Sequence, residues 1–271
     1  MCEHCGCAIT DPLSAVAHSG HHHDAPNVES VQVMSNLLAE NDALAAHNRE
    51  HFDAHGVLVI NLMSSPGAGK TALLERTVEA LGAKLRFAVI EGDLATENDA
   101  QRIRAKGVPA VQITTGSACH LDAHMVHHAL DALPLAGLDV LFIENVGNLV
   151  CPASFDLGQH LDVALLSVPE GDDKPQKYPV LFRTADALLI TKTDLLPLLP
   201  EFEPQRAQAS LRALASDAPV LHVSSRSREG IRAWCVWLEA ALATHRTAAM
   251  TLQAHRPAQS RVAEHEHRLD L

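Results

Sequence analysis

The chain has 271 residues, of which 47% are hydrophobic and 20% charged, and its formal net charge is −12. These values are typical of a globular protein with one large domain and appendages, and the negative charge argues against nucleic acid as a partner. No apolar run is long enough to cross a bilayer, and the N-terminal MCEHCGC lacks the regions of a secretory signal. We therefore expect a cytoplasmic protein with no membrane partner, whose six cysteines are thiols or metal ligands.

Residues 1–27 form the first region of the chain and offer almost nothing to a hydrophobic core. Three cysteines, Cys2, Cys5 and Cys7, lie in the first seven residues, and a histidine-rich run HSGHHHD follows at 18–24. Three thiolates at C-x-x-C-x-C spacing can surround one metal ion. We therefore predict a disordered, flexible metal-binding arm over residues 1–27.

From Val28 to His55, apolar residues recur at helical spacing and predict one or two helices that lead into the main domain. Seven apolar, strand-like runs then alternate with segments of helical character, and a last amphipathic helix is expected from about Gly230 to Ala243. This alternation predicts an α/β domain over 28–244, with a mostly parallel sheet of about seven strands flanked by helices, and a loose tail over 245–271. The predicted strands are Val57–Met63, Leu85–Ile90, Ala110–Ile113, Val140–Ile143, Val163–Val168, Ala187–Ile190 and Val220–Val223.

The first predicted strand leads into SSPGAGKT, a glycine-rich turn that opens a helix with Gly-Lys-Thr. This arrangement is typical of a phosphate-binding loop, so we predict a P-loop NTPase fold, although Ser64 stands where the usual pattern has glycine. Lys70 is expected to neutralise phosphate charge and Thr71 to hold Mg²⁺. The predicted nucleotide contacts of the loop are Ser65, Gly67, Ala68, Gly69, Lys70 and Thr71.

Three later segments follow predicted strands in the order found in GTPases. Asp93, in Glu-Gly-Asp, is expected to position Mg²⁺, and Glu144, in Glu-Asn-Val-Gly, to orient water or metal. Thr-Lys-Thr-Asp at 191–194 stands in place of N-K-x-D, so Asp194 is expected to bind the guanine edge and Lys192 to cover the base. Ser225 is expected in the loop near the guanine carbonyl. Together these segments predict GTP or GDP as the nucleotide.

Soft metal ligands surround this predicted nucleotide site. Cys119 and His120 follow the third predicted strand, at the expected start of a helix, and Cys151 lies just beyond the Glu-Asn-Val-Gly segment. Thiolate and imidazole suit Ni²⁺ or Zn²⁺ rather than Mg²⁺. Three ligands leave a site incomplete, and a two-fold homodimer would bring a second set opposite the first. The nearby His124, His127 and His128 are expected on an exposed helix face.

These motifs resemble those of the HypB-type hydrogenase nickel-incorporation GTPases, in the group that also includes the urease accessory GTPases. GSACHLDA and ENVGNLVCP carry most of the resemblance, together with the cysteine arm, SSPGAGKT, EGDLATENDA, EGDDKPQKYP and TKTDLLP. The resemblance implies a nickel site on the N-terminal cysteines. It also implies a Ni/Zn site at a dimer interface, and a maturation partner protein and the hydrogenase large subunit as partners. The residues implied for the two sites are Cys2, Cys5 and Cys7, and Cys119, His120 and Cys151.

The interpretation that the sequence favours is a GTP-hydrolysing nickel metallochaperone for [NiFe]-hydrogenase, in which nucleotide state controls the interfacial metal site. No arginine finger is evident, so slow intrinsic turnover is expected. The alternatives are a nickel store with incidental GTPase activity, and an accessory GTPase for another nickel enzyme such as urease. A small-molecule kinase is disfavoured because Asp194 follows Lys192 in the base-recognition segment.

Overall fold

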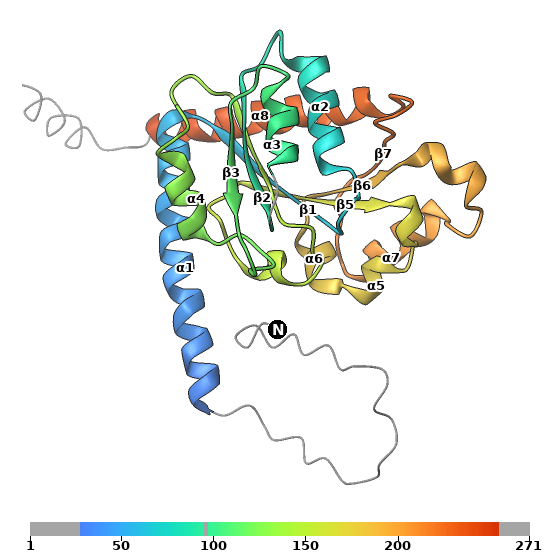
Figure 1. Cartoon of the computed structure of the whole chain (residues 1–271), viewed down its shortest axis with the longest axis horizontal. Coiled ribbons are helices and arrows are strands. Elements are labelled where there is room, and N and C mark those ends of the chain that lie inside the picture. Colours follow the sequence, from blue (N-terminus) through green and yellow to red (C-terminus); the bar gives the residue numbers. More distant parts are fainter. Residues whose placement is uncertain (1–27, 95–96, 255–271) are drawn as a thin grey trace, which may run out of the picture.

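The computed structural model describes residues 28–94 and 97–254, which form a seven-stranded sheet between two layers of helices (Figure 1). Every strand pair is parallel, and the strand order is β3-β2-β4-β1-β5-β6-β7. The predicted α/β sheet is therefore confirmed. The strands are β1 (Leu58–Ser64), β2 (Phe87–Asp93), β3 (Ala110–Thr114), β4 (Val140–Glu144), β5 (Leu161–Ser167), β6 (Ala187–Thr191) and β7 (Val220–His222).

Three helices cover one face of the sheet: α2 (Lys70–Leu81), α3 (Asn98–Arg104) and α8 (Ile231–Ala254). Alternate strand residues such as Ile60 and Phe142 point into this layer and are fully buried. Apolar side chains on both faces of a strand produce the continuous apolar runs seen in the sequence. Trp234 of α8 is fully buried there, and its indole N–H donates a 2.8 Å hydrogen bond to the Thr77 hydroxyl, which satisfies the buried polar group.

The opposite face is covered by α1 and α4 at one end of the sheet and by α5, α6 and α7 at the other (Figure 1). Phe52 of α1 and Val126 of α4 pack on β1, β2 and β4, and Phe182 of α6 packs on β5 and β6. The N-terminal half of α1 extends away from the sheet. The helices of this face are α1 (Val28–His55), α4 (Ala123–Leu130), α5 (Lys174–Lys177), α6 (Pro179–Thr184) and α7 (Pro204–Ala213).

Several elements differ from their predictions. The last helix continues past residue 244 to Ala254, so the first ten residues of the predicted loose tail, 245–254, are helical. The segment EGDDKPQKYP, whose polar character predicts a loop, contains α5 and opens α6, and Gln176 of α5 donates a 3.0 Å hydrogen bond to Ser210 of α7. Helical spacing cannot show elements of four to six residues, which is why these short helices escape the sequence pattern. The predicted arm, with Cys2, Cys5 and Cys7, lies outside the described residues.

Because all strands are parallel, their carboxyl ends meet at one edge of the sheet, where ligands of such folds bind. β1, β2, β4 and β6 all end there in polar residues, which places the predicted site segments side by side. None of the helices in the described part of the chain combines the length and hydropathy of a membrane span.

Candidate functional site

The loop between β1 and α2 has the geometry of a phosphate cradle. Gly67 and Gly69 have φ angles of +72° and +101°, which side-chain-bearing residues rarely adopt. α2 begins at Lys70, so the N–H groups of its first turn face the loop. Lys70 is buried, and its Nζ donates a 3.1 Å hydrogen bond to the Ser64 hydroxyl. Ser64, where the usual pattern has glycine, thus gives the lysine a partner inside the protein.

A cluster of three carboxylates, two of them buried and Asp99 half-buried, lies beside this loop. Oxygens of Glu91, Asp99 and Glu144 lie within 4.8 Å of one another, and the Thr71 hydroxyl donates a 2.8 Å hydrogen bond to Glu144 Oε1. Burial, and next the charge of Glu144, raises the pKa of Glu91 to about 8. Burial likewise raises the pKa of Glu144 to about 7, against the opposing effects of Lys70 and Thr71.

The cluster fits a hard divalent cation. One oxygen each of Glu91 and Glu144 is buried without a hydrogen-bond partner among the described residues, and buried polar groups normally have one. Oxygen ligands of this kind suit Mg²⁺. Asp93, the predicted Mg²⁺ residue, lines the same pocket but does not belong to the cluster. No sequence motif predicts Asp99, whereas Glu91 has one signal, a second carboxylate near Asp93 at the end of an apolar strand.

The predicted base-binding residues meet in a second pocket on the other side of the loop. Lys192, Asp194 and Ser225 line it together with Ala68 and Gly69. The Ser224 hydroxyl donates a 2.6 Å hydrogen bond to Asp194 Oδ1, which orients that carboxylate. Thr191, the departure from the N-K-x-D pattern, donates a 2.6 Å hydrogen bond from its hydroxyl to the Ala68 carbonyl. Its hydroxyl therefore ties the end of β6 to the phosphate loop.

The structure brings the three predicted soft metal ligands of the domain together. The Sγ atoms of Cys119 and Cys151 are 2.9 Å apart, and Cys119 Sγ is 3.7 Å from His120 Nδ1. The His120 ring stacks on Phe155 with centroids 3.9 Å apart. Burial lowers the pKa of His120, although the charge of Asp122 acts to raise it. The lowered pKa favours the neutral imidazole that binds metals.

The local structure around these ligands differs from the prediction in one detail. Cys119 and His120 lie in a bend before α4, because Asp122 caps the helix by accepting a 2.8 Å hydrogen bond from the Met125 N–H. Cys151 opens a 3-10 helix, η1 (Cys151–Ser154). The predicted metal ligands thus lie in a bend and at the start of a short 3-10 helix, which can move more readily than the strands they follow.

Asn145, at the end of β4, connects the ligand segment to the nucleotide pocket, which it lines. Its Oδ1 accepts hydrogen bonds from the backbone N–H groups of Leu121 (3.2 Å) and Val146 (2.9 Å). A Cβ atom added to Gly92 would lie 2.8 Å from the Leu121 side chain, so β2 also touches this segment. Sequence reasoning did not single out Asn145, whose signal is an amide within the Glu-Asn-Val-Gly segment.

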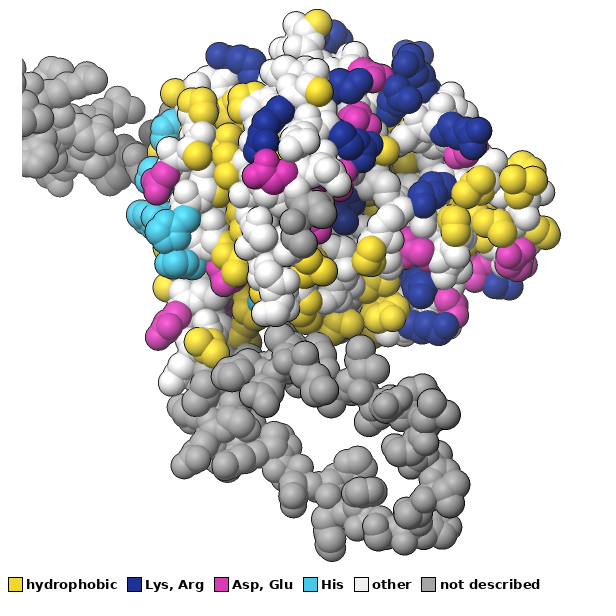
Figure 2. Space-filling view, viewed as in Figure 1, with side chains coloured by type: hydrophobic (Ala, Val, Ile, Leu, Met, Phe, Trp, Pro, Cys, Tyr) yellow, Lys and Arg dark blue, Asp and Glu magenta, His cyan; other side chains and the backbone are white. Residues whose placement is uncertain are grey.

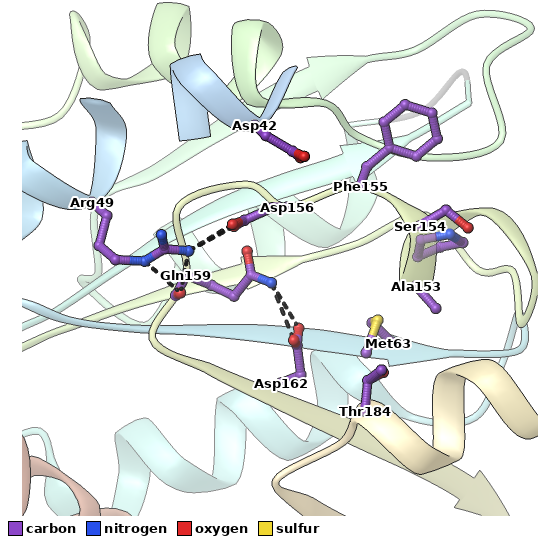
Figure 3. A pocket seen from close by; sticks show the side chains of 11 residues that line it. Asp42, Arg49, Met63, Ala153, Ser154, Phe155, Asp156, Gln159, Asp162 and Thr184 are labelled. Atoms are coloured by element: carbon purple, nitrogen blue, oxygen red, sulfur yellow. Dashed lines mark hydrogen bonds and ion pairs between the residues drawn. The ribbon is translucent and has the colours of Figure 1, made fainter. Parts of the chain in front are cut away.

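A further pocket lies next to the segment that follows Cys151 (Figure 3). Arg49 of α1 reaches across to both carboxylate oxygens of Asp156 at 2.8 Å. Gln159 donates hydrogen bonds to Asp162, whose pKa burial raises to about 6. Side-chain hydrogen bonds therefore join helix α1 to the segment that carries Cys151 and Phe155.

Comparison with known proteins identifies relatives of this chain. Residues 58–222 match the family model described as CobW/HypB/UreG, nucleotide-binding domain. Hydrogenase maturation factor HypB of Azotobacter vinelandii is 52% identical over 209 residues, covering 77% of this chain and 69% of its own. The Escherichia coli K12 protein of the same name is 48% identical over 209 residues, covering 77% and 72%. The hydrogenase/urease maturation factor HypB of Helicobacter hepaticus is 49% identical over 211 residues, covering 76% and 85%.

Two solved structures are also similar. HypB from Helicobacter pylori in complex with nickel has a TM-score of 0.73 and 43% identity, covering 76% of this chain and 97% of its own. HypB from Archaeoglobus fulgidus has a TM-score of 0.71 and 38% identity, covering 76% and 100%. The predicted P-loop fold and the predicted family are thereby confirmed. The chain belongs to the CobW/HypB/UreG family of nucleotide-binding proteins, within its HypB group.

Proposed function

We propose that this protein is a GTP-hydrolysing nickel metallochaperone that delivers Ni²⁺ for maturation of the large subunit of [NiFe]-hydrogenase. One observation carries the proposal: Asn145 joins the nucleotide pocket to the Cys119–His120–Cys151 group through the Leu121 N–H. The likeness to a nickel-bound HypB structure supports nickel as the cargo. Hydrogenase as the recipient follows from the names of the relatives.

The nucleotide-binding part of the proposal assigns a role to each polar group. The N–H groups of the loop and of the first turn of α2 bind the phosphates, and Lys70 neutralises their charge. Bound Mg²⁺ would stabilise charge on the phosphates, held by Thr71 and the carboxylate cluster, with Asp93 lining the same pocket. Ionised Glu144 positions the attacking water or the cation. No arginine of the described chain lines this pocket except Arg102, so we expect slow turnover.

The metal-binding part concerns Ni²⁺ as cargo. Two thiolates and one imidazole bind Ni²⁺ or Zn²⁺ and leave coordination positions open. A homodimer formed through the GTPase domain would complete the site with a second set of ligands. In this proposal Cys2, Cys5 and Cys7 bind nickel on the arm, the protein works in the cytoplasm, and a maturation partner protein exchanges nickel with it.

The two parts form one mechanism through reciprocal coupling. Bound GTP and Mg²⁺ would be held by the phosphate loop, Thr71 and Glu144, and would thereby fix the end of β4 against that loop, where Gly147 already packs on Pro66. Asn145 then moves the Leu121 segment and with it Cys119 and His120. Whatever factor GTP applies to nickel affinity, nickel must apply to GTP affinity, typically about 5–150-fold.

Guanine specificity is tested by exchanging the base and its partner together. An Asp194 carboxylate accepts hydrogen bonds from the N1–H and 2-amino group of guanine, whereas an amide at this position can donate to the 2-oxo group of xanthine. Asp194→Asn should therefore lower GTP affinity and raise XTP affinity. Nucleotide affinities are measured by competition with a fluorescent GDP analogue. Unchanged preference for GTP in the variant, or tighter binding of ATP by the wild type, would contradict a GTPase.

One observation favours a second recipient. The Helicobacter hepaticus relative is named a hydrogenase/urease maturation factor. The same switch could therefore serve urease. Nickel transfer to apo-hydrogenase and to apo-urease, measured side by side with purified components, separates the two.

A further inference from the structure

The surface of α2 next to the predicted base pocket carries a network of charged side chains. Several Lys and Arg side chains, with acidic ones between them, lie on the part of the surface that holds α2, α3 and the loop after β7 (Figure 2). Glu79 of α2 accepts hydrogen bonds from Arg76 at 2.6 Å and from Lys106 at 2.8 Å. Arg228, in the loop after β7, donates to the same carboxylate at 3.5 Å. Ion pairs between exposed groups contribute little to stability, so most of this network is an ordinary charged surface.

Arg76 also makes a contact of a different kind. Its Nε donates a 2.7 Å hydrogen bond to the backbone carbonyl of Ser225, in the turn after β7. The Arg76 side chain is only 28% exposed, and both residues line the predicted base pocket. Because the donor is charged and its Nη1 is held by Glu79, this hydrogen bond is stronger and better oriented than one from a neutral, mobile side chain. Arg76 therefore joins the helix that follows the phosphate loop to the turn that follows β7.

The turn at 224–229 extends this contact to Asp194. The Ser224 N–H donates to the Glu229 carbonyl at 2.9 Å, and the Ser227 N–H donates to the Ser224 hydroxyl at 3.0 Å, so the turn is closed on itself. The buried Ser224 hydroxyl donates in its turn to Asp194 Oδ1 at 2.6 Å. The position of the Asp194 carboxylate therefore depends on where this turn is held.

The other end of the connection is the phosphate site. Arg76 lies within two turns of Lys70, the first residue of α2, so its position is fixed relative to the phosphate loop. A nucleotide that spans the phosphate pocket and the base pocket binds best when the two are already held at the right separation, because ordering a loop on binding lowers the affinity. The hydrogen bond from Arg76 to Ser225 supplies this order before the nucleotide binds.

We propose that Arg76 is a positioning residue for the nucleotide base: it holds the turn at 224–229 against α2 and thereby sets the affinity for guanine nucleotides through Asp194 and Ser225. Guanine as the base rests on the proposed function. No sequence motif singles out Arg76, because its partner is a backbone carbonyl 149 residues away in the chain.

Nucleotide affinities of Arg76→Gln test this role in the full-length protein. Glutamine is a good helix former but lacks the charged Nε–H donor. GDP and ADP are titrated calorimetrically in the presence of Mg²⁺, and the fitted stoichiometry reports the folded fraction of each protein. A hydrogen bond from a charged donor corresponds to about tenfold in an equilibrium constant, and partial exposure reduces it, so GDP affinity should fall about 3- to 10-fold. ADP lacks the N1–H and 2-amino groups that Asp194 accepts from, and it should bind the variant as it binds the wild type.

Arg228→Gln is the matched control. It removes another guanidinium from the same turn and the same Glu79, but the Arg228 side chain is 69% exposed and does not line the base pocket. GDP affinity should therefore stay within about twofold of the wild type. A loss as large as that of Arg76→Gln would trace the effect to surface charge and overturn the inference. Unchanged GDP affinity in Arg76→Gln, or equal losses for GDP and ADP, would overturn it as well, since the arginine would then not act on the base.

The GTP hydrolysis rate of the wild type separates this inference from the proposed function. Wild-type protein that binds GDP but does not hydrolyse GTP would count against the proposed function, whereas a selective loss of GDP affinity in Arg76→Gln would still establish the role of Arg76. Normal hydrolysis by the wild type, with GDP affinity unchanged in Arg76→Gln, would overturn this inference alone.

Discussion

Asn145 and Leu121, 24 residues apart in the chain, are joined by a 3.2 Å hydrogen bond from the Leu121 N–H to the Asn145 Oδ1. Asn145 is buried and directly follows β4. The preceding Glu144 accepts a hydrogen bond from Thr71 beside the phosphate loop, and the following Val146 donates its N–H to Asn145 Oδ1. Leu121 directly follows His120. In the proposed mechanism, a displacement of the β4 end would thus reach His120, a predicted metal ligand, through one side chain.

Asn145→Ala should remove the effect of nucleotide on nickel affinity. The change leaves the N–H groups of Leu121 and Val146 without their acceptor, a cost of about 1–3 kcal/mol for each buried group. Nickel affinities with GDP and with a non-hydrolysable GTP analogue should become equal, as measured by chelator competition. Asn61→Ala is the matched control, since it removes the partner of the Asn145 amide N–H groups but not the bond to Leu121. If Asn145→Ala kept the full nucleotide effect, this connection would not carry the coupling.

The buried carboxylates should make the metal-free protein less stable as pH rises. In the unfolded chain the pKa of a glutamate is 4.5. In the folded protein the pKa of Glu91 is raised to about 8 and that of Glu144 to about 7. Between pH 4.5 and these raised pKa values, the folded state therefore holds more protons than the unfolded state. The free energy of unfolding falls with rising pH over this range. His120 and His160, whose pKa values burial lowers, act in the opposite direction only below about pH 6.5.

Urea unfolding between about pH 6.5 and pH 8 isolates the carboxylate effect from that of the histidines. Glu91→Gln should flatten the fall in stability over this range, because the amide has no proton to lose. Mg²⁺ with GDP should also reduce the fall, by binding the ionised carboxylates. A slope that is identical in wild type and Glu91→Gln would refute the raised pKa of Glu91.

Thr191→Val tests the contact that replaces the usual asparagine. Valine keeps the shape but leaves the Ala68 carbonyl without the 2.6 Å hydrogen bond from the threonine hydroxyl. A typical hydrogen bond contributes about 1 kcal/mol, which corresponds to about fivefold weaker GDP binding. Isothermal titration with GDP gives the value, and Thr193→Val, two residues further on, provides the control. Equal GDP affinity in wild type and Thr191→Val would show that this hydrogen bond does not shape the site.

Phe155→Ala should weaken nickel binding and leave GTP hydrolysis unchanged. The Phe155 ring stacks on His120 at 3.9 Å, and such ring pairs contribute about 0.5–1.5 kcal/mol to holding a ring in place. Nickel affinity of the cysteine site should therefore fall about 2- to 10-fold. The Phe155→Tyr variant, which retains the ring, should bind as the wild type does. A hydrolysis rate that changed with Phe155→Ala would mean that this residue acts on the nucleotide site.

The sequence predicts the sheet and the phosphate loop well, because continuous apolar strands and a glycine-rich turn before a helix are local patterns. It also places Cys119 and His120 near Cys151, which lies 31 positions after His120, since both segments follow strands that end at one edge. Asp99, by contrast, joins Glu91 and Glu144 only through the packing of α3 against the sheet.

The most direct test of the account is the nickel affinity of the cysteine site in the two nucleotide states. The full-length chain with Cys2, Cys5 and Cys7 replaced by serine is titrated against a chromogenic chelator, with GDP and with a non-hydrolysable GTP analogue. The proposed coupling predicts affinities that differ about 5- to 150-fold, a coupling of about 1–3 kcal/mol, and a difference that disappears in Cys151→Ala. Equal affinities in both nucleotide states would contradict it and leave a nickel store in which GTP hydrolysis is incidental.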